Sequence, residues 1–262
     1  MPRVRIDQLL VERGIAASRA AAQAMLLAGE VDIPGMGRAL KAGNLVETDV
    51  ELHVRGRRRW ASRAGEKLEA ALDAFDLDPS GKTALDAGAS TGGFTDVLLS
   101  GGAARVYAID VGRGQLVDRL ARDPRVVSME RTNLRTLASL PAAVQLATLD
   151  LSFISLRLVL PVIRRLLTDD GEAVALVKPQ FEAGKGSVPR GGVIRDPAVH
   201  ADVLTRFVTD AAAAGFGVAG LMRSPIAGSD GNVEFLVYLV PPPGMSPEAL
   251  ENRIRVLAAP SG

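Results

Sequence analysis

From Lys82 onward, short apolar runs alternate with helical segments, and this alternation constrains the fold more than any other feature. The apolar runs lie at 84–86, 106–110, 126–129, 146–150, 173–177, 218–222 and 235–240. Helical segments are expected between them, at 95–100, 115–121, 156–167 and 197–214. This pattern is typical of βαβ units, which build a mostly parallel sheet with helices on both faces. Only residues 223–233 separate the last two runs, too few for a helical crossover, so we expect these runs to form an antiparallel pair.

A glycine-rich turn follows the first apolar run. The stretch Asp86-Ala87-Gly88-Ala89-Ser90-Thr91-Gly92-Gly93-Phe94 ends a strand and opens a helix. Glycines in such a turn let the backbone approach a ligand closely, and ligands of parallel sheets lie outside the carboxyl ends of the strands. The spacing is not the G-x-G-x-x-G that seats a pyrophosphate on a helix N-terminus. It suits a cofactor without phosphate, such as S-adenosylmethionine.

Two further strand ends fit the same cofactor. Asp110 ends the second run, where a carboxylate can accept hydrogen bonds from both ribose hydroxyls. Asn133 follows the third run, at a position that suits recognition of an adenine edge. The candidate cofactor-binding residues are Asp86, Gly88, Ser90, Gly92, Gly93, Phe94, Asp110, Asn133 and Asp150.

A reaction centre is expected at the ends of the next two runs, which carry Asp150 and Lys178. A lysine at the end of a buried strand is costly unless it is paired or functional, and a desolvated amine can serve as a general base. Lys67, just before the α/β region, and Glu234, at the start of the last run, could complete an alternating cluster of lysines and carboxylates. Two unrelated salt bridges are the alternative interpretation.

The N-terminal region is basic. Residues 1–67 carry a net charge of +4 and the remainder −3, which suggests that the front of the chain meets a polyanion. Two short helices are expected, the first ended by Gly14 and the second running over 19–28 behind Ser18, followed by strands at 31–33 and 49–54.

This region resembles an S4-type RNA-binding domain. The residues that carry the resemblance are Arg5-Ile6-Asp7-Gln8-Leu9-Leu10, Ser18-Arg19-Ala20-Ala21-Ala22 and Leu26-Leu27-Ala28-Gly29-Glu30-Val31. The usual Asn-Gly turn is replaced by Asp32-Ile33-Pro34-Gly35. The candidate RNA contacts are Arg3, Arg5, Arg13, Arg19 and Lys41, together with Arg58 of a basic joint and Arg190 of a glycine-rich loop.

Composition excludes several other functions. The chain has no cysteine, so disulfides, thiolate metal sites and cysteine nucleophiles are excluded. The two histidines, His53 and His200, have no ligand-like neighbours, and we expect no metal. No apolar run is long enough to span a membrane and no secretory signal is recognisable, so we expect a cytoplasmic protein without stable membrane association.

The whole chain resembles the TlyA family, which joins an S4 domain to an FtsJ-like ribosomal RNA methyltransferase and has also been called haemolysin. The matching segments are Ser62-Arg63, Lys67-Leu68, Asp86–Phe94, Asp110-Val111-Gly112, Glu130-Arg131-Thr132-Asn133, Asp150–Leu156, Val177–Lys185 and Gly231–Glu234. The resemblance implies 2′-O-methylation of cytidine in ribosomal RNA or ribosomal subunits, with S-adenosylmethionine as donor and a catalytic tetrad of Lys67, Asp150, Lys178 and Glu234.

The resemblance also defines the expected organisation. We expect an S4-like α+β domain over 1–55, a basic linker over 56–66, and an α/β class I (Rossmann-like) methyltransferase domain with a terminal antiparallel strand over 67–262. The main alternative function is a membrane-active haemolysin. A degenerate methyltransferase that only binds RNA and a small-molecule methyltransferase are the other two.

Overall fold

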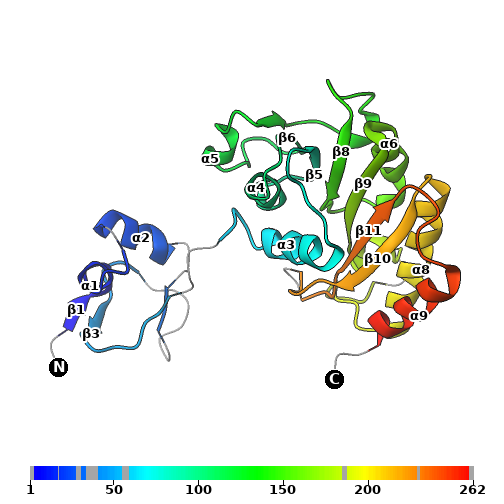
Figure 1. The fold of residues 1–262 in the computed structure, drawn as a ribbon. Helices are drawn as coiled ribbons and strands as arrows, with labels where there is room; N and C mark the ends of the chain where they lie inside the picture. Colours follow the sequence, from blue (N-terminus) through cyan, green and yellow to red (C-terminus); the bar gives the residue numbers. More distant parts are fainter. Residues whose placement is uncertain are drawn as a thin grey trace. The chain divides into compact units, whose positions relative to one another are not determined.

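The computed structural model describes residues 3–16, 18–27, 31–33, 41–54, 59–184, 188–228 and 231–259 (Figure 1). The chain forms two compact units, Met1–Arg59 and Trp60–Gly262. Part of the stretch expected to be a linker therefore belongs to the second unit. Trp60, only 8% exposed, lies in that unit's core.

The described residues of the first unit form two short helices and two small antiparallel ribbons. Its elements are β1 (Arg3–Arg5), α1 (Ile6–Glu12), α2 (Arg19–Leu27), β2 (Val31–Asp32), β3 (Leu45–Glu47) and β4 (His53–Val54). β1 pairs with β3, and β2 pairs with β4. Apolar side chains of the two helices, including Ile6, Leu10 and Leu26, form a separate core.

The expected helices of this unit are present, but its strands differ from the expectation. Gly14 follows α1 with a φ of 68°, and the backbone N–H of Ala21 donates to Ser18 Oγ at the start of α2. The strand expected at 49–54 is reduced to β4 because the backbone N–H of Val50 closes a turn onto the carbonyl of Glu47. The expected Pro34-Gly35 turn lies outside the described residues.

The second unit is a helix-covered sheet. Its helices are α3 (Ala64–Phe75), α4 (Gly93–Ser100), α5 (Asp118–Ala121), α6 (Leu160–Leu166), α7 (Pro179–Glu182), α8 (Pro197–Ala213) and α9 (Pro247–Ala258), with 3₁₀ turns η1 (Leu134–Thr136) and η2 (Leu156–Leu158). Its strands are β5 (Thr83–Ala87), β6 (Arg105–Ile109), β7 (Val126–Met129), β8 (Val144–Leu149), β9 (Leu167–Val177), β10 (Gly217–Arg223) and β11 (Phe235–Val240).

These seven strands form one sheet in the order β10-β11-β9-β8-β5-β6-β7. All neighbouring pairs from β9 to β7 are parallel, whereas β11 is antiparallel to both β9 and β10. The expected antiparallel pairing of the last two strands is confirmed. Because β11 lies between β9 and β10, it alone runs against the direction of the sheet.

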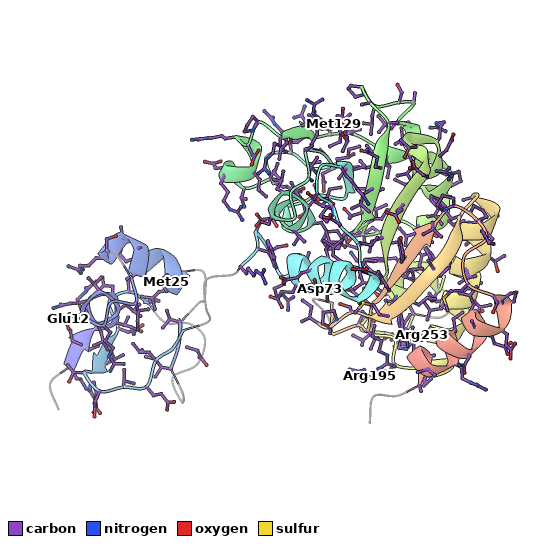
Figure 2. All side chains as sticks on the ribbon, in the orientation of Figure 1. Glu12, Met25, Asp73, Met129, Arg195 and Arg253 are labelled. Carbon is purple, nitrogen blue, oxygen red and sulfur yellow. The ribbon has the colours of Figure 1, made fainter. Side chains whose placement is uncertain are left out.

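Helices cover both faces of the sheet, and side chains fill both layers (Figures 1 and 2). One layer packs α3, α4 and α5 on the sheet, and the other packs α6, α8 and α9. The helix expected over 156–167 is divided into η2 and α6. Pro161 causes this division because it has no backbone N–H to continue a helix that begins at Leu156, and it stands instead in the first turn of α6.

Candidate active site

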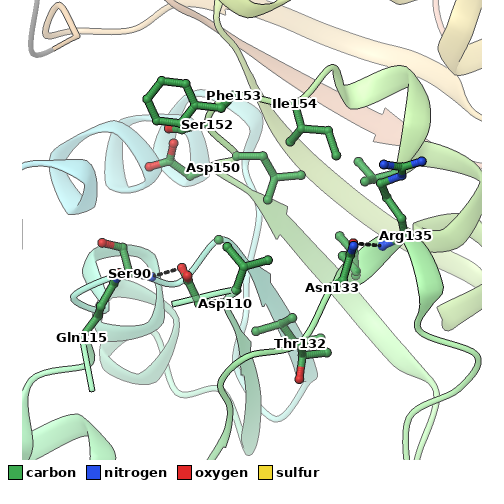
Figure 3. A pocket seen from close by; sticks show the side chains of 16 residues that line it. Ser90, Asp110, Gln115, Thr132, Asn133, Arg135, Asp150, Ser152, Phe153 and Ile154 are labelled. Carbon is green, nitrogen blue, oxygen red and sulfur yellow. Dashed lines mark hydrogen bonds between the residues drawn. The ribbon is translucent and has the colours of Figure 1, made fainter. Parts of the chain in front are cut away.

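A cavity of about 460 Å³ opens where β5, β6 and β8 end at their carboxyl edges (Figure 3). That volume is typical of a small-molecule site. Of the predicted cofactor residues, five line it: Gly88, Ser90, Asp110, Asn133 and Asp150. The carboxyl edge is also where the topology of an open α/β sheet places a ligand.

The Asp110 carboxylate is held by the backbone around it. Ser90 N donates to Asp110 Oδ2 at 2.8 Å and Gly112 N donates to Oδ1 at 2.7 Å. Each oxygen has a second lone pair, so the carboxylate is fixed in orientation and can still accept hydrogen bonds. Its chemistry fits the ribose hydroxyls of an adenosyl group.

Asn133 is oriented in a similar way. Its side-chain Oδ1 accepts from the backbone N–H of Arg135 at 3.0 Å, which caps η1 (Figure 3). The amide nitrogen is thereby left as the donor at the wall of the cavity. A fixed donor at this wall is suited to an acceptor on a purine edge.

The glycine-rich turn divides into two parts. Gly88 has a φ of 88°, and a Cβ there would collide with the backbone carbonyl of Asp150, so only glycine allows the ends of β5 and β8 to approach so closely. Gly92, Gly93 and Phe94 do not line the cavity. A Cβ at Gly92 would meet leucine side chains of the α5 region, one at Gly93 would meet Ser62, and Phe94 is buried in the core.

Asp86 lies behind the cavity rather than in its wall. It is fully buried, with Thr95 Oγ1 donating to Oδ2 at 2.6 Å and Thr148 Oγ1 donating to Oδ1 at 3.1 Å. Burial, together with the nearby charge of Asp150, raises the pKa of Asp86 to about 7. The side chain therefore joins β5 to α4 and β8.

The four predicted catalytic side chains form two ion pairs. Lys178 Nζ lies 2.6 Å from Asp150 Oδ1 and donates to Ser152 Oγ at 3.0 Å. Lys67 Nζ donates to Glu234 Oε2 at 2.5 Å. The side chains of both lysines are 10% exposed, so neither pair is an ordinary surface salt bridge.

The sheet brings the two pairs to one edge. Phe235 of β11 is paired with Val177 of β9, and the next residues along each strand, Glu234 and Lys178, therefore lie at neighbouring positions. This arrangement follows from the reversed direction of β11, whose first residues meet the last residues of β9. Asp150 belongs both to this cluster and to the cavity wall.

Several residues at the cavity were not predicted. Phe153 is 91% exposed, has a φ of 63° and contacts Phe181 at a ring-centroid distance of 5.1 Å. Ser152 and Phe153 directly follow the predicted strand end at Asp150. Their closeness to Asp150 in the sequence is the signal that could have identified them. Gln115 and Arg135 also line the cavity, but no motif marks them.

Two contacts fasten the loops that carry the tetrad. Glu182 of α7 accepts from Ser155 Oγ at 2.6 Å and from the backbone N–H of Leu156 at 2.8 Å, which joins the segments after β8 and β9. Burial raises the pKa of Glu182. Asn232 is 1% exposed and bonds the backbone of Gly192 and Ile194, two residues from Glu234 in the chain. Arg190 is exposed and lies two residues before Gly192 in the chain.

The remaining predicted RNA contacts belong to the first unit. Arg3, Arg19 and Lys41 are exposed and Arg5 is partly exposed. Arg13 donates to the backbone carbonyls of Thr48 and Val50, a contact that fastens α1 to the loop after β3. Arg58 lies outside the described residues.

The sheet order, its single reversed strand and the cavity at the carboxyl edge define a class I methyltransferase. Residues 60–240 match the model of the FtsJ-like methyltransferase family. The chain belongs to this family and, within it, to the TlyA group. Its methyl donor is therefore S-adenosylmethionine.

Individual relatives support the assignment. YqxC of Bacillus subtilis, which carries an rRNA methyltransferase name, is 50% identical over 239 residues, covering 90% of this chain and 85% of YqxC. The Mycobacterium tuberculosis 16S/23S rRNA (cytidine-2′-O)-methyltransferase TlyA is 46% identical over 241 residues, covering 90% of each chain. A solved structure of a Streptococcus thermophilus protein with a hemolysin name is 40% identical, with a TM-score of 0.75 over 98% of this chain and 96% of that one.

The hemolysin names on some relatives make membrane insertion a relevant question. Across the part of the chain that the structure describes, no helix is both long enough and apolar enough to cross a bilayer.

Proposed function

We propose that this protein transfers a methyl group from S-adenosylmethionine to a ribose 2′-hydroxyl, of a cytidine, in ribosomal RNA. The observation that carries the proposal is the tetrad, in which Lys178 and Asp150 lie 2.6 Å apart and Lys67 and Glu234 lie 2.5 Å apart. Asp150 also lines the cavity. The names of the TlyA relative and of YqxC support ribosomal RNA as substrate. The S4-like unit supplies the second RNA-binding surface. The methyl transfer takes place in the cytoplasm.

S-adenosylmethionine supplies an electrophilic methyl group on a sulfonium. A 2′-hydroxyl is a weak nucleophile until its proton is removed, so the protein must orient the hydroxyl and receive that proton. We assign both roles to Lys178, and the Asp150 carboxylate, 2.6 Å from its amine, offsets the positive charge of that side chain. Lys67 adds positive charge near the developing alkoxide, and Glu234 keeps that lysine in place.

Other residues hold the cofactor and the RNA. Asp110 and Asn133 would hold the ribose and adenine of the adenosyl group, and Gly88 lines the same cavity. Arg190, beside the turn fastened by Asn232, contacts the RNA backbone near the methylated ribose. Charge reversal at Arg190 should weaken RNA binding and leave cofactor affinity unchanged.

The test is a methylation assay with labelled S-adenosylmethionine and unmodified ribosomal subunits. The Lys178→Ala variant is compared with Lys82→Ala, in which another ion-paired lysine of the same unit is removed. We expect label on a ribose 2′-oxygen, lost in Lys178→Ala and retained in Lys82→Ala, while both variants bind cofactor. Label on a base contradicts the ribose mechanism, and no label from a cofactor-binding wild type contradicts ribosomal RNA as substrate.

A membrane-active haemolysin is the competing function. No described feature favours it beyond the names of relatives. A liposome leakage assay tests it directly, and leakage that is independent of S-adenosylmethionine would support it.

A further inference from the structure

A single buried carboxylate organises the basic surface of the first unit. The Asp7 side chain is 0% exposed and accepts four hydrogen bonds. Arg5 donates two of them, from Nε to Oδ1 at 3.0 Å and from Nη2 to Oδ2 at 2.9 Å. Arg19 and Gln23 each donate one to Oδ2 at 3.1 Å. These bonds hold the pKa of Asp7 far below its usual range, so the carboxylate stays charged.

The two arginines keep most of their donors for another partner. The Arg5 side chain is 43% exposed and the Arg19 side chain is 57% exposed. A guanidinium has five N–H donors, of which Arg5 uses two on Asp7 and Arg19 uses one. Both guanidiniums are about 3 Å from the same carboxylate oxygen, so Asp7 holds the two side chains at one point. The cluster carries a net charge of +1.

Neighbouring backbone adds to this surface. The turn at 41–44 packs on the start of α1, where the backbone N–H of Ile6 donates to the carbonyl of Asn44. A Cβ at Gly43 would stand 3.4 Å from Arg5 Nη1, so the glycine leaves the guanidinium room beside the turn. Lys41, at the start of this turn, is exposed. The exposed Lys41 thus belongs to the same turn as Gly43, which lies beside the Arg5 guanidinium.

We propose that Asp7 is a positioning residue that holds Arg5 and Arg19 as a preformed fork for phosphates of the RNA backbone. The inference rests on the proposed RNA methyltransferase function and assigns the fork to RNA capture rather than to catalysis. Arginine side chains lose much rotamer freedom when they bind, and a fork fixed in advance loses less. Bidentate guanidinium–phosphate contacts also require a fixed orientation, which Asp7 supplies.

The Asp7→Asn variant separates preorganisation from simple charge because the two effects change RNA affinity in opposite directions. Asn removes a negative charge from a surface that binds a polyanion, so charge alone predicts tighter RNA binding. If Asp7 orients the two arginines, its loss instead predicts weaker RNA binding, by roughly fivefold to twentyfold. Glu12→Gln is the matched control, since it neutralises an exposed carboxylate of the same helix that contacts neither arginine.

The assay measures binding of the full-length protein to unmodified ribosomal subunits over a range of salt concentrations, and methylation kinetics on the same subunits. We expect Asp7→Asn to raise KM for the subunits with kcat at saturation unchanged, and Glu12→Gln to bind as wild type or slightly tighter. Arg5→Ala and Arg19→Ala should each weaken binding and lower the salt slope by about one. Circular dichroism establishes that each variant is folded.

Arg5→Lys provides a second test if Asp7→Asn does not fold. Lysine keeps the charge but cannot make the two bonds to Asp7 that a guanidinium makes, so binding should weaken nearly as much as in Arg5→Ala. Folded Asp7→Asn with unchanged or tighter binding, or Arg5→Lys with wild-type binding, would overturn the positioning role. Unchanged RNA binding in both alanine variants would show that Arg5 and Arg19 do not contact RNA. Ribose methylation of the subunits tests the proposed function independently of that outcome.

Discussion

Replacing Asp86 by Asn should make the stability of the catalytic unit less sensitive to pH. Burial beneath the cofactor cavity raises the pKa of Asp86 from 3.8 to about 7. A carboxyl whose pKa is higher in the folded state favours folding while it is protonated, and that advantage is lost as the pH rises toward 7. This difference in pKa corresponds to about 4 kcal/mol of unfolding free energy. About 3 kcal/mol of it is lost between pH 5 and pH 8.

Denaturant unfolding followed by tryptophan fluorescence measures this effect. Trp60 is the single tryptophan of the chain and is buried in the catalytic unit, so its emission reports that unit alone. The wild-type free energy of unfolding should fall by about 3 kcal/mol more than that of Asp86→Asn between pH 5 and pH 8. His200, whose burial lowers its pKa, is present in both proteins and cancels from the comparison.

Asp170→Asn is the matched control because this aspartate is exposed, and it should keep the wild-type pH dependence. The two hydroxyl donors on Asp86 can also bond an asparagine oxygen, so the variant should fold. Parallel pH profiles for wild type and Asp86→Asn would refute the reasoning, because they would mean that Asp86 is ionised in the folded protein at pH 5.

Two further predictions concern the site, and a third concerns the packing of α3. Glu182→Ala should lower kcat about tenfold because the segments after β8 and β9 come apart, whereas Glu182→Gln, which can still bond Ser155 and Leu156, should keep kcat within about threefold. Asp110→Ala should raise the Kd for S-adenosylmethionine roughly 10- to 100-fold in calorimetry, and a Kd within twofold of wild type would remove Asp110 from the cofactor site. Gly65→Ala should cost about 1–3 kcal/mol of unfolding free energy in denaturant titrations, since its Cβ would overlap the Trp60 side chain; an unchanged value would show that this contact adjusts freely.

The strand–helix alternation predicted the sheet well because the period of apolar residues reflects burial on both faces. All seven expected runs of the second unit are strands, and the short connection between the last two correctly indicated antiparallel pairing. The position of β11 inside the sheet could not be predicted, since the connection length limits direction but not which edge a strand joins. Pro161 carried the signal for the division between η2 and α6, which apolar periodicity alone does not show.

The candidate site was predictable where a residue directly follows a strand. Gly88, Asp110 and Asp150 satisfy that condition, and all three line the cavity. Asp86 lies inside β5, one residue before its end, and faces the α4 layer together with Ala84, opposite to Leu85 and Ala87. Its pairing with threonines on α4 and β8 depends on packing between separate elements.

No sequence motif predicts the contacts between residues that are far apart in the chain. The bonds of Glu182, Asn232 and Asp7 join loops or helices whose relative placement is set only by the folded unit. The exposed Phe153, with its positive φ, is likewise a property of the turn and not of composition.

The Lys67–Glu234 pair joins the first helix of the catalytic unit to its last strand, across 167 residues. Every residue that lines the cofactor cavity lies between Gly88 and Val159. The lining of the cavity and the Lys67–Glu234 pair therefore depend on different parts of the chain. A chain that ends before β11 would keep every residue of the cavity lining and would leave the Lys67 amine, whose side chain is only 10% exposed, without its carboxylate partner.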